Sequence, residues 1–272
     1  MSGAEPAVVR TVPAVATAEP FTGSRALVVG AGGAIGAAVA RGLAAAGATV
    51  LAADLRGAAE VAATLDGVGH AGVEVDVTDL ASMQALVARA TSDGDLHAVV
   101  YAAGANTTGP IAELDWADYD RVMDVNLRGA FHLAQALARP FADQVAPASL
   151  VLLASTAGQR GEAAGSVYCA SKFGLLGLME SLAAEFAPWG VRVNAVAPGN
   201  VDSPMLRDLA ARIGAREGTD TATVLQALAD EAAARRLVTV TEVAAACTWL
   251  ASPAASGITG TTVNVDAGTL TA

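Results

Sequence analysis

The sequence predicts a single doubly wound α/β domain, in which a sheet of about seven parallel strands carries helices on both faces. Short runs rich in valine, leucine and alanine alternate with longer segments in which apolar residues recur at helical spacing. The short runs are almost continuously apolar, as expected of parallel strands that are buried on both faces. No internal repeat or linker divides the chain after residue 25, which indicates one domain.

The predicted elements follow one another in regular order. Strands are expected at Ala26–Val29, Thr49–Ala53, Val73–Val75, Ala98–Tyr101, Leu150–Ala154, Val191–Val196 and Thr262–Val265. Helices are expected at Ile35–Ala46, Leu80–Thr91, Trp116–Arg139, Val167–Phe186 and Val240–Leu250. Residues 202–235 break this rhythm with glycine, proline and mixed charge, so a helical lid is expected over the strand ends. The catalytic domain should span 23–272, after a mobile N-terminal tail over 1–22.

The composition argues against several classes of partner. The net charge of −11 argues against nucleic acid, which rewards basic surfaces. The longest early stretch without charge, residues 26–40, is short and glycine-rich, so no membrane span is expected. Residues 1–22 lack the basic segment of a secretory signal, and Cys169 and Cys247 lack metal-binding spacing. We therefore expect a cytoplasmic protein without a metal site or a disulfide.

The first chemical motif is a glycine-rich turn between the first predicted strand and the first predicted helix. It reads GAGGAIG over residues 30–36. Gly30 permits a tight turn, and Gly36 lets the helix approach the strand closely. Gly32 and Gly33 expose the backbone to an anion, and the helix N-terminus offers free N–H groups to a pyrophosphate. An ordinary glycine-rich turn is the alternative, but the position after the first strand favours a nucleotide site.

Asp54, at the end of the second predicted strand, bears on the choice of cofactor. A carboxylate there can accept hydrogen bonds from the adenosine ribose and would repel a 2′-phosphate, which favours NAD over NADP. Two observations keep NADP open: a strand-end aspartate is often a simple cap, and Arg56 could reach a phosphate.

The stretch SVYCASKFG contains Lys172, which is the only lysine of the chain. Tyr168 stands one helical turn before it, so the two side chains share a helix face. The ammonium favours the phenolate, so the pKa of Tyr168 is expected to fall below its ordinary value of about 10. Ser155 ends a predicted strand, where open α/β sheets place their ligands. A solvated helix face is the usual interpretation of such a pair, but Ser155 and the glycine turn favour general acid–base chemistry.

These motifs together resemble the short-chain dehydrogenase/reductase family over residues 24–270. The matching segments, in chain order, are GAGGAIG 30–36, Asp54, DV 76–77, AAG 102–104, Asn126 in VNLRGAF, Ser155 in STAG, YCASK 168–172, VNAVAPGNVDSPM 193–205 and ITGTTVNVDAG 258–268. The resemblance implies a Rossmann fold and a nicotinamide cofactor. It also implies the catalytic set Asn126, Ser155, Tyr168 and Lys172.

By this resemblance, Tyr168 would exchange a proton with the reacting oxygen, and Ser155 would hold that oxygen. Lys172 would bind the nicotinamide ribose and lower the Tyr168 pKa, and Asn126 would position a water that relays protons through Lys172. A homotetramer built on the helices at 116–139 and 167–187 is also implied. The expected cofactor contacts are Gly30, Gly33, Ala34, Ile35, Gly36, Asp54, Leu55, Asp76, Val77, Ala102, Ala103, Gly104, Tyr168, Lys172, Pro198, Gly199, Val201 and Ser203.

The chain departs from the family pattern at a few positions. The usual Asn-Asn-Ala-Gly is Tyr-Ala-Ala-Gly over 101–104, so altered packing is expected there rather than lost catalysis. The usual threonine before the glycine turn is Val29, and the middle glycine of that turn is Ala34. The usual VDGG is VDAG over 265–268. None of these changes touches the catalytic set.

The sequence leaves the substrate open. Residues 215–245 resemble 3-hydroxybutyrate dehydrogenases, but Ala157 and Gly165 stand where those enzymes place the His and Lys that clamp a carboxylate. A neutral secondary alcohol, a polyol or a ketone is equally open. The predicted activity is NAD-dependent interconversion of a small secondary alcohol and its ketone; the alternative is a non-catalytic NAD(H)-binding redox sensor or interaction protein. Candidate substrate contacts are Asn106, Ser155, Ala157, Gln159, Arg160, Asn200, Met205 and Leu206.

Overall fold

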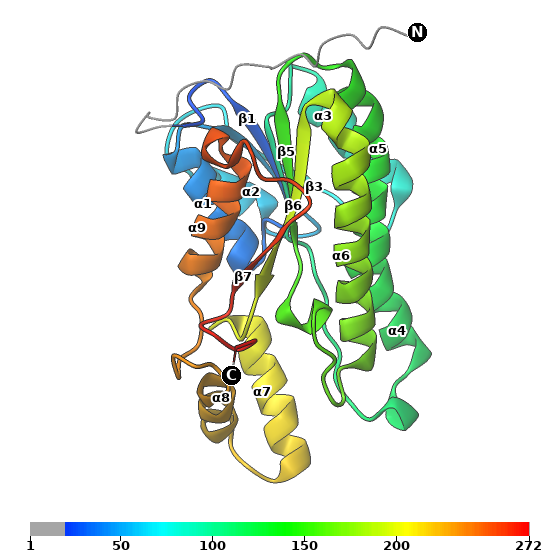
Figure 1. Cartoon of the computed structure of the whole chain (residues 1–272), viewed down its shortest axis with the longest axis vertical. Helices are drawn as coiled ribbons and strands as arrows, with labels where there is room; N and C mark the ends of the chain where they lie inside the picture. The colour runs from blue at the N-terminus through cyan, green and yellow to red at the C-terminus, as the bar shows by residue number, and fades with distance from the viewer. Residues whose placement is uncertain (1–19, 272) are drawn as a thin grey trace, which may run out of the picture.

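The computed structural model describes residues 20–271, and they form three layers around one central sheet (Figure 1). Within these residues the sheet has seven parallel strands in the order β3-β2-β1-β4-β5-β6-β7. The order reverses between β1 and β4, which creates the crevice where such sheets bind ligands. The strands are β1 (Arg25–Val29), β2 (Thr49–Asp54), β3 (Ala71–Glu74), β4 (Ala98–Tyr101), β5 (Ala148–Leu153), β6 (Val191–Pro198) and β7 (Thr262–Val265).

Helices cover both faces of this sheet (Figure 1). One core cluster joins α1, α9 and one face of the strands, and the other joins α3, α5, α6 and the opposite face. Strands β4 and β5 are buried at every position, which explains their continuous apolar sequences. The doubly wound prediction is therefore confirmed. The helices are α1 (Ala34–Ala45), α2 (Ala58–Ala63), α3 (Leu80–Thr91), α4 (Trp116–Met123), α5 (Gly129–Asp143), α6 (Ser166–Phe186), α7 (Pro204–Glu217), α8 (Thr221–Asp230) and α9 (Val240–Ala251).

The helix predicted at 116–139 is divided in the structure. A π-helical turn, η2 (Asp124–Arg128), separates α4 from α5. Such turns frequently interrupt α-helices at functional sites, and η2 contains Asn126. The short helix α2 was not predicted.

The predicted boundary between the tail and the domain is wrong by at least two residues. Phe21 is 2% exposed and packs in the cluster with α1 and α9. Its amide donates a hydrogen bond of 2.9 Å to the carbonyl of Ala46. Burial of this apolar ring holds residue 21 in the domain. The rest of the predicted tail, residues 1–19, lies outside the described residues.

The segment predicted as a lid forms the helices α7 and α8, which lie beyond the carboxyl ends of the strands (α7 is yellow and α8 golden brown in Figure 1). Both helices start at side-chain caps. The Ser203 hydroxyl accepts from the Leu206 amide at 3.3 Å, and the Asp220 carboxylate accepts from the Thr223 amide at 2.8 Å. The chain then returns to the sheet, where the Ala234 amide donates to the carbonyl of Ala267 at 3.0 Å. No helix in the described part of the chain combines the length and apolarity of a membrane span.

Candidate active site

A cavity of about 1370 Å³ opens at the carboxyl ends of the strands, beneath α7 and α8. Its walls include the turn after β1, the ends of β2 and β6, the loops after β4 and β5, and the first turns of α6 and α7. Every cofactor contact predicted from the sequence lines it. The topology therefore gathers into one cavity the residues that sequence patterns placed in separate motifs.

The glycine turn presents bare backbone to this cavity. Gly30 has a φ of +87°, and a side-chain carbon there would lie 2.3 Å from the amide nitrogen of Ala103. A side-chain carbon on Gly32 would lie 2.1 Å from the carbonyl oxygen of Arg56. Helix α1 follows without a side-chain cap, so its first N–H groups face the turn. This arrangement suits an anionic group such as a pyrophosphate.

Asp54 ties the glycine turn to the end of β2. Its Oδ2 accepts a hydrogen bond from the Gly32 amide at 2.9 Å, and its Oδ1 accepts one from the Arg56 amide at 3.1 Å. Each carboxylate oxygen has a second lone pair, so Asp54 can still accept hydrogen bonds from a diol. Arg56 lines the same cavity.

Ser155 and Tyr168 meet on the wall of the cavity. Ser155 follows β5 and caps the short 3₁₀-helix η3 (Thr156–Gly158), its hydroxyl accepting from the Ala157 amide at 3.2 Å. Tyr168 stands in the first turn of α6. Burial raises the pKa of Tyr168 to about 12, although its hydrogen bond with Ser155 opposes the increase. The phenol is therefore protonated at neutral pH.

Lys172 lies one turn further along α6 and is only 3% exposed. Its Nζ donates to the carbonyl of Leu153 at 2.8 Å and lies 5.6 Å from the centroid of the Tyr168 ring. Burial lowers the pKa of Lys172 to about 8. Burial dominates the pKa of Tyr168 in this structure, so the lowering of that pKa by Lys172 stays a prediction.

Asn126 is fully buried behind the cavity and does not line it. Its Oδ1 accepts from the Ala105 amide at 2.7 Å, and its Nδ2 donates to the Ala105 carbonyl and to the Ser171 hydroxyl, both at 2.9 Å. The side chain thus fastens the loop after β4 to α6. A side-chain carbon on Gly104 would lie 3.6 Å from the Asn126 Oδ1 and 3.9 Å from the Lys172 Nζ.

Two of the predicted substrate contacts do not line the cavity. Ala157 is buried inside the turn η3. Gln159 donates its amide to the Asn264 Oδ1 at 2.6 Å, which directs it toward β7. The turn η3 places Ala157 behind the wall and turns Gln159 away from the cavity, an effect that linear spacing could not show. The other candidates line the cavity: Asn106, Ser155, Arg160, Asn200, Met205 and Leu206.

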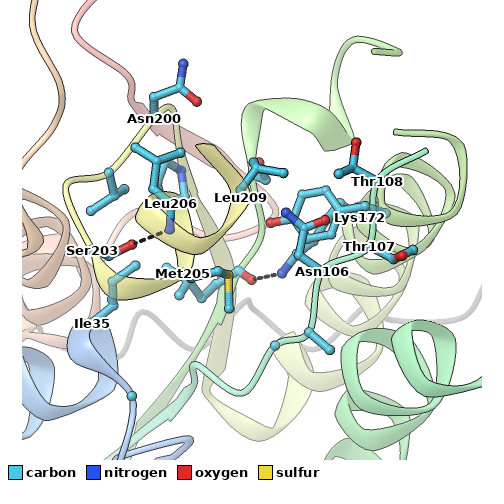
Figure 2. Close-up of a pocket in the computed structure, with 18 of the residues that line it drawn as sticks. Ile35, Asn106, Thr107, Thr108, Lys172, Asn200, Ser203, Met205, Leu206 and Leu209 are labelled. Carbon is cyan, nitrogen blue, oxygen red and sulfur yellow. Dashed lines mark hydrogen bonds between the residues drawn. The ribbon is translucent and has the colours of Figure 1, made fainter. Parts of the chain in front are cut away.

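The substrate side of the cavity also holds residues that the sequence did not indicate. Figure 2 shows Met205, Leu206 and Leu209 of the lid facing the same space as Asn106, Thr107 and Thr108 from the loop after β4. Met205, Leu209 and Ile213 recur at helical spacing, so an apolar stripe on α7 was a usable signal. The remaining unpredicted contacts include Glu162, Val224, Ala227, Leu228 and Glu231. Across residues 20–271, no group of His, Cys, Asp and Glu is arranged to hold a metal ion.

The chain is similar to known proteins over most of its length. Residues 30–270 match the family model described as Enoyl-(Acyl carrier protein) reductase. The chain is 38% identical over 255 residues to cis-4-hydroxycyclohexanecarboxylate dehydrogenase of Sinomonas cyclohexanicum, covering 92% of this chain and 98% of that protein. It is 33% identical over 246 residues to galactitol 2-dehydrogenase of Agrobacterium fabrum, covering 89% of this chain and 96% of that protein.

The fold is similar to solved structures as well. The crystal structure of sorbitol-6-phosphate 2-dehydrogenase SrlD from Erwinia amylovora matches with a TM-score of 0.85 and 32% sequence identity, covering 90% of this chain and 98% of that chain.

Proposed function

The chain belongs to the short-chain dehydrogenase/reductase family, and we propose that it is an NAD-dependent oxidoreductase that interconverts a small secondary alcohol and its ketone. The observation that carries the proposal is the meeting of Tyr168, Ser155 and Lys172 in the cavity that also contains the glycine turn. The relatives described above are dehydrogenases of hydroxyl-bearing compounds by their names. Their substrates differ, so the family alone leaves the substrate of this chain open.

The residues of the cavity fit a nicotinamide dinucleotide. Gly30 and Gly32 leave room that any side chain would fill, and the start of α1 favours a pyrophosphate beside them. Asp54 would accept hydrogen bonds from the adenosine ribose, and its charge would repel a 2′-phosphate. This supports NAD. Arg56 lines the same region and supports NADP as the alternative cofactor.

Tyr168 would act as the general acid and base. When bound, the nicotinamide would exchange a hydride with the carbon that carries the reacting oxygen. Ser155, which shares a hydrogen bond with the phenol, would hold that oxygen while Tyr168 gives it a proton or removes one. A phenol with a pKa of about 12 is ready to donate to a ketone at neutral pH. For alcohol oxidation, its pKa has to be lowered in the loaded site.

Lys172 and Asn126 would support this proton transfer. The Lys172 ammonium uses one proton on the Leu153 carbonyl and has two more for ribose hydroxyls. Its position 5.6 Å from the Tyr168 ring centroid also allows it to stabilise a phenolate. The side chains of Asn126 and Lys172 both lie near Gly104. The proposal includes a water that Asn126 positions there and that relays protons to Lys172.

The lid and the oligomer complete the proposal. Helices α7 and α8 would close over the substrate, since Met205 and Leu206 line the cavity from α7. Large apolar side chains stand exposed on α4, α5 and α6, among them Trp116, Phe131 and Phe173. Their exposure supports a homotetramer built on these helices. Light scattering tests this, and a monomer at micromolar concentration would reject it. The proposed location is the cytoplasm.

The test of the activity is the absorbance of reduced nicotinamide, measured with NAD⁺ and NADP⁺ separately against secondary alcohols, polyols and hydroxy acids. Turnover with NAD⁺ supports the proposal. Turnover with NADP⁺ alone would overturn the role given to Asp54. If no alcohol is turned over but fluorescence still shows that NADH binds, the sensor alternative is favoured. In that alternative, Tyr168 and Ser155 need no chemical role.

A further inference from the structure

We propose that the substrate is an uncharged polyol, and that Glu162 and Glu231 select it by accepting hydrogen bonds from hydroxyl groups beside the reacting one. This inference rests on the proposed function and names the substrate class for the same cavity. The inference rests on the carboxylates of Glu162 and Glu231, which are far apart in the chain, and on the phenol of Tyr168.

Glu162 places a negative charge beside Tyr168. It lies in the loop between η3 and α6, and both residues line the cavity. The Gly165 amide donates to the Glu162 carbonyl at 3.1 Å, which fixes this loop. The carboxylate is close enough to raise the pKa of the Tyr168 phenol. In the described part of the chain, the Glu162 side chain takes part in no ion pair.

Glu231 reaches the cavity from the lid side, directly after α8. Its Oε2 accepts a hydrogen bond from the Asn200 side-chain amide at 3.3 Å. The same amide also donates to the Leu228 carbonyl at 3.0 Å, so Asn200 connects the end of β6 to the lid and orients Glu231. Loss of hydration raises the pKa of Glu162, and the charge of Glu231 raises it further, which places the two carboxylates within electrostatic reach.

The groups around this pair define what it can bind. Arg160 lines the cavity and lowers the pKa of Glu162, but it forms no ion pair among residues 20–271. The Arg216 Nη2 lies 3.7 Å from the Glu217 Oε1. This carboxylate partly neutralises the Arg216 charge and so weakens its attraction for an anionic ligand. Lys172 also lines the cavity, but its Nζ already donates to the Leu153 carbonyl. Arg160 is therefore the competing anion contact that the test below includes.

An uncharged polyol satisfies these groups best. Carboxylates only accept hydrogen bonds, and hydroxyl groups donate them. A substrate carboxylate or phosphate would meet the like charges of Glu162 and Glu231 and be repelled. An alcohol with a single hydroxyl would have no second group to donate a hydrogen bond to Glu162. The apolar side chains of Leu209, Ile213 and Val224 would cover the carbon skeleton.

Three ring alcohols of matched shape test the substrate class: cyclohexanol, a vicinal cyclohexanediol and 4-hydroxycyclohexanecarboxylate, each with NAD⁺. We expect kcat/KM for the diol to exceed both others by roughly tenfold, the ratio for a difference of about 1.4 kcal/mol in transition-state binding. Higher kcat/KM for the carboxylate than for the diol would overturn the proposal.

Single substitutions then test the two residues. In Glu162→Gln and in Glu231→Gln, kcat/KM for the diol should fall and that for the carboxylate should rise, each by roughly tenfold, because the repulsive charge is gone. The decisive quantity is the diol-to-carboxylate ratio of kcat/KM, because loss of the Glu162 charge also lowers the pKa of Tyr168 and so affects the rate with all three alcohols. Cyclohexanol, which offers the two carboxylates no second hydroxyl, measures the change common to all three. Glu185→Gln is the matched control, because Glu185 is exposed on α6 and does not line the cavity.

The outcomes separate this inference from the proposed function. If the enzyme oxidises these alcohols but neither glutamine variant changes the diol-to-carboxylate ratio, the polyol assignment is wrong and the oxidoreductase proposal stands. The same holds if the carboxylate is used well and Arg160→Gln abolishes that use. If none of a wider panel of alcohols is oxidised with either cofactor while NADH binds, both proposals are wrong.

Discussion

The hydroxyl of Tyr101 donates a hydrogen bond to the main-chain carbonyl of Val125, the residue before Asn126. Tyr101 ends β4 and is fully buried, and Val125 lies in the π-helical turn η2. The bond joins the sheet to the turn that positions Asn126. It also explains Gly129, where a side-chain carbon would lie 2.3 Å from the Tyr101 hydroxyl. The departure from the family pattern at residue 101 thus gives the site a contact of its own.

Removing this contact should destabilise the fold. Tyr101→Phe keeps the ring but deletes the hydroxyl, so we expect unfolding to cost about 1 kcal/mol less, as for a typical buried hydrogen bond. Urea denaturation measures it. Tyr119→Phe is the control, because Tyr119 is partly exposed on α4 and is not part of this contact. Equal stability of the Tyr101→Phe variant and the native chain would show that the bond contributes nothing.

The proposed acid–base role predicts a large loss of activity in Tyr168→Phe. The variant retains the ring but has no proton to exchange, so turnover should fall at least about 100-fold while NADH binding is unchanged. Steady-state rates and the fluorescence of bound NADH measure the two effects. Cys169→Ser is the control, because Cys169 is buried beside Gly165 and should not contribute to catalysis. Near-normal turnover of Tyr168→Phe would exclude the role.

The buried ammonium of Lys172 should make stability depend on pH. Burial lowers its pKa from 10.5 to about 8, so between these values the unfolded chain binds more protons than the folded one. The free energy of unfolding should therefore rise with pH across that window through Lys172, by up to roughly 3 kcal/mol. Lys172→Met should lack this increase.

The measurement is the difference between the urea stability curves of Lys172→Met and the native chain from pH 7 to pH 11. Taking the difference is necessary because buried Cys247, whose pKa burial raises to about 12, loses stabilisation as pH rises above 9. Parallel curves for the two proteins would contradict the assignment.

The charge of Asp54 should determine which cofactor is preferred. Asp54→Asn keeps an oxygen for one of the two backbone N–H groups but removes the repulsion toward a 2′-phosphate. We expect the NAD-to-NADP ratio of kcat/KM to fall by roughly fivefold, because a single exposed charge contact is worth up to about 1 kcal/mol. Arg56→Gln in the same background should weaken NADP again if its guanidinium reaches the phosphate. An unchanged ratio in Asp54→Asn would place the selectivity elsewhere.

Much of the fold was predictable because buried parallel strands have almost continuous apolar sequences, as β5 does at all its positions. The cofactor side of the cavity was predictable for a related reason: its residues follow strand ends that the topology brings together. The substrate side was predictable only in part, because six of the eight candidate contacts line the cavity but other lining residues were missed. Glu162 and Glu231 come from loops far apart in the chain, and no spacing connects them. The turn η3 buries Ala157 behind the cavity wall, which the sequence did not indicate. The π-helical turn η2 has no distinctive sequence periodicity from which it could be predicted.

Ala267 has a strained backbone conformation, and the energetic cost of this strain can be measured. It replaces the glycine that the family pattern has after Asp266, yet it adopts a φ of +52°, which disfavours side chains. Its carbonyl accepts the Ala234 amide at 3.0 Å, where the lid returns to the sheet. Ala267→Gly should therefore raise the free energy of unfolding by about 1 kcal/mol, measured by urea denaturation. Ala85→Gly, at an exposed position inside α3, should lower the free energy of unfolding by about 1 kcal/mol. Glycine there increases the conformational entropy of the unfolded chain and relieves no strain. A loss of stability in both variants would mean that contacts of the Ala267 methyl group outweigh its backbone strain.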